Sequence, residues 1–97
     1  MMSDAGDGVD IPEHLLGLLQ GFELALETAG ENFWARRIGE IRAAIAVGDP
    51  YAVQRLFTSF GGSGSLNDLQ LEGDVRRMSS EIYLIAKETW HQIRHAN

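Results

Sequence analysis

Apolar residues recur at intervals of three and four along most of this chain, and this spacing places them on one face of an α-helix. Four segments show the pattern, with glycine or proline near the breaks between them. The expected helices cover residues 11–29, 32–47, 51–60 and about 74–95. Apart from Leu69 and Leu71, nothing alternates as a strand would. The sequence therefore predicts an all-α fold, a small four-helix bundle.

The breaks between these segments carry capping signals. Gly48 lies where a left-handed residue usually ends a helix, Asp49 can cap the next helix, and Pro50 suits its first turn, which needs no amide hydrogen. Asn32 can cap the second helix in the same way. Residues 10–13 combine a capping acid with a first-turn proline and a glutamate three residues on. The first three helices thus have a predicted start.

The chain has 97 residues and no cysteine, so its stability must come from packing or self-association rather than from disulfides. We expect residues 1–9 to form a disordered tail and residues 10–97 to form a single helical domain. The first residues lack the basic and apolar regions of a secretory signal, and no apolar run approaches the roughly 20 residues that span a bilayer. A soluble, cytoplasmic protein is expected.

The charge balance indicates which kinds of partner the protein could bind. Fourteen acidic residues against eight basic ones give a net charge of −6. This charge repels nucleic-acid phosphates and anionic membranes, and it favours cationic proteins at long range. We therefore expect a protein partner that is basic, and neither nucleic acid nor membrane.

The first helix concentrates part of this charge. Glu23, Glu27 and Glu31 follow at four-residue steps, and the helix has no basic residue of its own to offset them. Like charges at this spacing cost a few tenths of a kcal/mol, and acids near a helix C-terminus also oppose its dipole. A solvated face is one interpretation, and a surface kept for binding is the other.

The segment FGGSGSLNDLQL, residues 60–71, is unusually rich in glycine. It follows a helix rather than a strand and has no nearby lysine, so it does not match a phosphate-binding loop. We expect an ordered loop in which Gly61 or Gly62 adopts the positive φ that ends the third helix, and Ser65 and Asp68 cap a short turn. Three leucines are expected to hold the loop on the bundle: Leu66, Leu69 and Leu71.

Several of these residues form a wider pattern. It comprises Trp34, the Gly48-Asp49 turn, the string Gly61-Gly62-Ser63-Gly64-Ser65-Leu66-Asn67-Asp68-Leu69, and Ser80-Glu81-Ile82-Tyr83. The pattern, from about Phe33 to Ala86, resembles a family of short bacterial helical proteins of unknown function. Ser63 stands where a larger apolar residue such as Met is expected. The resemblance implies a small helical bacterial protein and supplies no activity.

Catalytic and metal-binding patterns are weak. No serine has a nucleophile-elbow context, and the histidines lie at position 14 and near the C-terminus. Glu88, His91 and His95 share a helix face, which two imidazoles could use for zinc or nickel. However, histidine is favoured in a last helical turn by the helix dipole, and no cysteine is present to complete a structural site. We expect no enzyme activity, no cofactor and no metal.

The two tryptophans have different expected roles. Trp34 begins the row of apolar residues along the second helix and is expected to be buried. Trp90 lies at the edge of the apolar row of the last helix, where its ring could contact a second chain in a homodimer.

These features favour a non-enzymatic binding module. The expected function is that of an acidic inhibitor or immunity-type protein that neutralises a basic partner such as a toxin or nuclease. The alternative is a small-ligand or anion sensor, dimeric or monomeric, that uses backbone amides of the glycine-rich loop. The candidate partner-binding residues are Glu23, Glu27, Glu31, Ser63, Ser65, Asn67 and Asp68.

Overall fold

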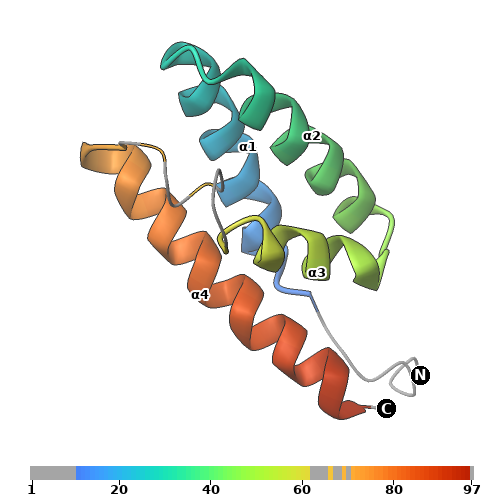
Figure 1. The fold of residues 1–97 in the computed structure, drawn as a ribbon. Helices are drawn as coiled ribbons and strands as arrows, with labels where there is room; N and C mark the ends of the chain where they lie inside the picture. The colour runs from blue at the N-terminus through green and yellow to red at the C-terminus, as the bar shows by residue number, and fades with distance from the viewer. Residues whose placement is uncertain (1–10, 62–65, 67–68, 70, 97) are drawn as a thin grey trace.

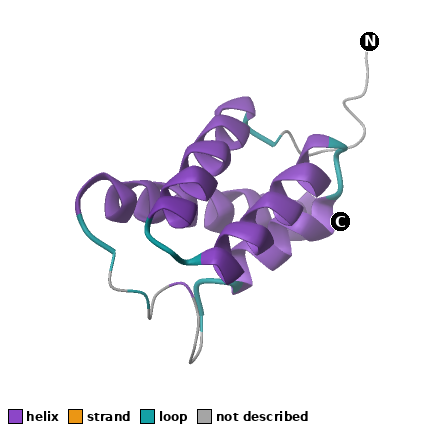
Figure 2. Ribbon diagram, turned by 90° about the horizontal axis from the view of Figure 1, so that it is seen from above, coloured by secondary structure: helices purple, strands orange, loops and turns teal. Residues whose placement is uncertain are grey.

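The chain folds into four helices, with no strand among the residues described (Figures 1 and 2). The computed structural model describes residues 11–61, 66, 69 and 71–96, so the expected tail of residues 1–9 lies outside it. The helices are α1 (Glu13–Thr28), α2 (Asn32–Ala46), α3 (Pro50–Thr58) and α4 (Gly73–Ala96). The prediction of a small all-α four-helix bundle is confirmed.

The helices close into a ring of contacts. α1 packs against α2 and α4, and α3 packs against the same two helices. In Figure 1, α1 and α2 run side by side, and α4 lies against α1 and α3 on the side away from α2. None of the helices in the described ranges has the length and apolar character needed to cross a membrane.

The core is built from the apolar stripes that the sequence predicts. Fully buried or nearly buried side chains come from all four helices: Leu15, Leu19, Phe22, Leu26, Ile38, Ile41, Ile45, Val53, Leu56, Ile82 and Ala86. The prediction that Trp34 is buried was wrong. Its ring is half-buried at the edge of the core, and Ala35 occupies the buried position in its place. The small Ala35 side chain allows close packing there. The indole instead lies edge-on to Phe33, with ring centroids 5.3 Å apart.

Two glycines end the first two helices as the sequence predicts. Gly30 and Gly48 have φ values of 83° and 86°, the left-handed conformation that glycine adopts without steric cost. The residue after each glycine donates its backbone N–H back across the turn, from Glu31 to the Leu26 oxygen at 2.9 Å and from Asp49 to the Ala44 oxygen at 3.1 Å. Each glycine also donates its own N–H, from Gly30 to the Glu27 oxygen and from Gly48 to the Ile45 oxygen, which completes the pair of bonds of a Schellman motif at each turn. They satisfy carbonyls that the helix end would otherwise leave unpaired.

The helix starts agree with the sequence at one of three places. The Asp49 carboxylate accepts a hydrogen bond from the Tyr51 N–H at 2.9 Å, and Pro50 is the first helical residue of α3. Asn32, expected as a cap, is instead the first residue of α2, because the Schellman turn places Glu31 at the cap position. Pro12 likewise precedes α1 rather than lying in its first turn, and Asp10 lies outside the described residues.

The end of α3 corrects a further expectation. Gly61 does not have a positive φ, and Gly62 lies outside the described residues. Ser59 keeps a right-handed conformation, and the N–H groups of Phe60 and Gly61 bond to carbonyls three residues back. This tightened last turn ends the helix without a left-handed residue.

The leucines after α3 behave as predicted. Leu66 is 1% exposed and donates its N–H to the Ser59 oxygen at 2.9 Å, while Leu69 and Leu71 are half-buried against the core. The Tyr83 ring of α4 stacks on Phe57 of α3, with centroids 5.9 Å apart. The hydrogen bond of Leu66 thus ties the described part of the loop to the end of α3, and the ring contact ties α3 to α4.

Glycine substitutions in and after α1 provide a first test. Gly17 is exposed within α1, and an added Cβ would meet no atom within 4 Å, so Gly17→Ala should stabilise the fold by up to about 1 kcal/mol through helix propensity. Gly30→Ala should destabilise it by about 1–2 kcal/mol, because alanine resists the left-handed conformation. Urea denaturation measures both. A loss of stability in Gly17→Ala would contradict the open environment assigned to that position.

Candidate functional site

A charged groove lies between α1 and α2. Its lining residues are Glu23, Glu27, Asn32, Ala35, Arg36, Gly39, Glu40, Arg42 and Ala43. Three small residues of α2 recur at four-residue steps along it, at positions 35, 39 and 43. Residues four apart share a helix face, so this strip of α2 carries little side-chain bulk. The long charged side chains of both helices therefore stand around a shallow depression.

An ion pair joins the two sides of this groove. The Arg42 Nε–H of α2 donates to Glu23 Oε1 of α1 at 3.1 Å. The side chains are 35% exposed for Arg42 and 21% exposed for Glu23, so the pair is only partly screened by water. A charge-assisted bond of this kind fixes the orientation of the carboxylate.

Gly39 makes room for that carboxylate. A Cβ built on Gly39 would lie 2.7 Å from Glu23 Oε2, which is closer than real Cβ contacts allow. Glycine in a helix interior costs up to about 1 kcal/mol relative to alanine, and Gly17 of α1 carries this cost with no close contact. At Gly39 the close contact is the far end of the flexible Glu23 side chain, which would have to shift to admit a Cβ.

The acidic face predicted from the sequence is therefore only partly uncompensated. Glu23 is paired with Arg42, a residue 19 positions away that no local pattern in α1 could reveal. Glu27 is exposed and Glu31 is half-exposed, and neither forms a salt bridge with any residue that the structure describes. Glu31 does not line the groove, whereas Glu40 of α2 does.

The loop residues proposed for partner binding, Ser63, Ser65, Asn67 and Asp68, lie outside the described residues. Sequence reasoning missed the α2 side of the groove, namely Gly39, Glu40 and Arg42. One signal for it was available, because Gly39 interrupts an otherwise regular helical pattern. The pairing of α1 with α2 through this glycine required the tertiary structure.

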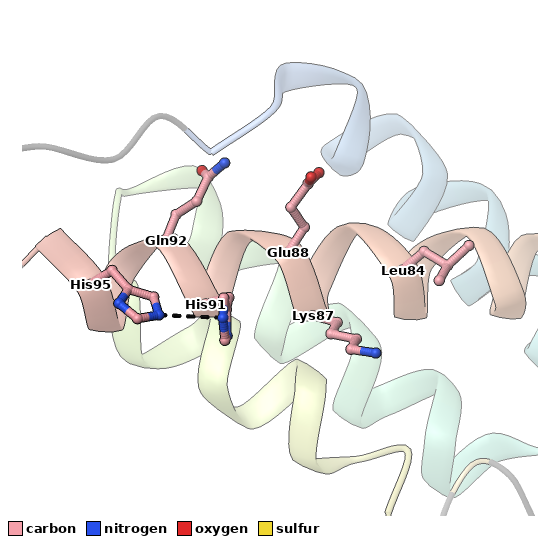
Figure 3. Close-up of a pocket in the computed structure, with 6 residues that line it drawn as sticks. All are labelled: Leu84, Lys87, Glu88, His91, Gln92 and His95. Carbon is pink, nitrogen blue, oxygen red and sulfur yellow. Dashed lines mark hydrogen bonds between the residues drawn. The ribbon is translucent and has the colours of Figure 1, made fainter.

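A second depression lies on the outer face of α4. It is lined by Leu84, Lys87, Glu88, His91, Gln92 and His95 (Figure 3). The His91 and His95 rings meet there, with 3.3 Å between their Nε2 atoms. Glu88 lines the same depression, but Figure 3 shows its carboxylate directed away from these rings. Leu84 is 62% exposed, so the depression also offers apolar surface.

The fold and these surfaces define a small all-α domain with a charged groove between two helices. Residues 27–79 match a family model described as a domain of unknown function, DUF6966, and the chain belongs to that family. The matched segment contains α2 and α3 whole, together with every lining residue of the groove except Glu23. No curated protein and no solved structure is significantly similar to the chain.

The role of Gly39 can be measured through the ion pair that it accommodates. Gly39→Ala should displace the Glu23 carboxylate, while improved helix propensity offsets the loss, so the free energy of unfolding should change by less than about 1 kcal/mol. A double-mutant cycle with Glu23→Gln and Arg42→Met should give a coupling of about 0.3–1 kcal/mol in the wild type and almost none in the Gly39→Ala background. Equal coupling in both backgrounds would show that Gly39 does not position the carboxylate.

Proposed function

We propose that this protein is a non-enzymatic binding module, an acidic inhibitor or immunity-type protein of the bacterial cytoplasm that binds a basic protein such as a toxin or nuclease. The groove between α1 and α2 is the surface through which it acts. A lysine or arginine of the partner enters the groove and is neutralised by its carboxylates.

The observation that carries this proposal is the arrangement of acids around the groove. Glu27 of α1 and Glu40 of α2 line it together, and neither has a salt-bridge partner among the residues described. Both side chains are exposed, so a cation can reach them without unfolding the bundle. A guanidinium or ammonium group placed between two helices in this way interacts with carboxylates from both sides.

The basic residues of the groove contribute specificity. Arg36 and Arg42 lie in the same lining, so a partner must present its cation beside the acids and away from the two guanidinium groups. Like-charge contacts of this kind disfavour wrong registers and wrong partners. The net charge of −6 acts at longer range, because it attracts a basic protein before contact.

Charge reversal in the groove tests the proposal. Glu27→Lys should abolish capture of the partner from a lysate of the source cells, as measured by quantitative mass spectrometry. Glu81→Lys is the matched control, because Glu81 is exposed on α4, outside the groove, and each variant changes the net charge from −6 to −4 by replacing one negative charge with a positive one. Glu23 is unsuitable here, since its reversal would also break the pair with Arg42.

The captured protein is then purified and its association rate measured at two salt concentrations. Glu27→Lys should lower the rate by roughly tenfold at low salt, and Glu81→Lys should lower it far less. Equal effects of the two reversals would show that Glu27 acts only through the net charge of the protein. Unchanged capture by Glu27→Lys would refute the groove as the binding surface.

A further inference from the structure

We propose that His91 and His95 form a zinc-binding site on the outer face of α4. The two residues are four apart, so their side chains lie one above the other on the same side of the helix. A hydrogen bond joins their rings, with 3.3 Å between the Nε2 atoms and 4.6 Å between the ring centroids, so one Nε2 carries the proton (Figure 3). When that proton moves to Nδ1 of the same ring, both Nε2 atoms offer lone pairs, and the pair becomes the donor set of a chelate.

The distance between the two Nε2 atoms can be compared with the coordination geometry of different metals. Two nitrogens each about 2.05 Å from zinc, at the tetrahedral angle of about 109°, lie about 3.3 Å apart. Neighbouring positions of an octahedral or square-planar ion with similar bond lengths lie about 2.9 Å apart. The observed 3.3 Å matches the tetrahedral spacing of the two nitrogens. The ring centroids lie 4.6 Å apart, closer than the roughly 5.2 Å of two rings bound in line to such an ion, so the rings must turn outward when zinc binds.

The helix supplies this arrangement in advance. Both histidines are exposed, and α4 runs from Gly73 to Ala96, so the rings stand on regular backbone. Both also line the depression on α4, where an ion can approach from solvent. The sequence favoured a helix-dipole role for these histidines, but that role does not require their Nε2 atoms to converge.

The site has two protein ligands and open coordination positions. No group of three or more histidine, cysteine or acidic side chains able to hold a metal occurs among the described residues. Glu88 does not supply a third ligand, because its side chain points away from the two rings (Figure 3). Two water molecules complete the tetrahedron, one more than in catalytic zinc sites, which have three protein ligands. Lys87 lies one turn before His91, and its ammonium group opposes a bound cation.

This site is separate from the proposed function. None of the residues that line the α1/α2 groove belongs to α4. Loss of zinc binding and loss of partner capture can therefore be produced by different substitutions and told apart.

Calorimetric titration of Zn²⁺ into the untagged protein tests the proposal. We expect one saturable site per chain, and His91→Asn or His95→Asn should each weaken it. Loss of an outer-shell partner already costs about 10–100-fold in metal affinity, so loss of one of two direct ligands should cost at least about tenfold. His14→Asn is the matched control, because it removes the third histidine from an exposed position on α1 and should leave zinc affinity unchanged. Circular dichroism checks that each variant is folded.

Two neighbouring positions sharpen the test. Lys87→Glu replaces the opposing charge with a carboxylate on the row of residues 87, 91 and 95, and should tighten zinc binding by about tenfold or more. Glu88→Gln should have little effect, since that side chain faces elsewhere. Absence of saturable binding by the wild type, undiminished affinity in His91→Asn and His95→Asn, or no gain in Lys87→Glu would each overturn the assignment.

Discussion

Burial of the apolar face of α1 is the interaction on which the rest of the structure depends. Leu15, Leu19, Phe22 and Leu26 are all fully buried, and α1 is packed against both α2 and α4. A 97-residue chain without cysteine has little other means of stabilisation, and helices in proteins take most of their stability from tertiary packing. Each helix is therefore held mainly by its contacts with the others.

The same packing decides what the surface can offer. Because α1 and α2 pack against each other, charged side chains of both helices line one groove between them. Gly39 removes bulk where the Glu23 carboxylate lies, and Arg42 holds that carboxylate in place. Glu27 and Glu40 remain available to solvent. The proposed binding surface thus combines one fixed ion pair with two exposed acids.

The family match covers most of one of the two surfaces and leaves out the histidine pair of the other. The matched segment, residues 27–79, contains nearly the whole groove lining and the described leucines of the loop. The histidine pair lies beyond it, in the second half of α4. Most of the groove lining thus falls within the segment that the family model covers, whereas both proposed zinc ligands lie outside it.

Local patterns were sufficient for the elements of this fold. Helix periodicity, Gly48, Asp49 and Pro50 determined the number of helices and the turn between α2 and α3, because caps and turns depend on residues close in sequence. The acids of α1 were also visible in the sequence. The histidine pair was visible in the same way, since His91 and His95 lie four residues apart on one exposed helix. Tertiary structure alone decided that Arg42 neutralises Glu23 and that Glu40 lines the groove with Glu27, because these residues come from two different helices.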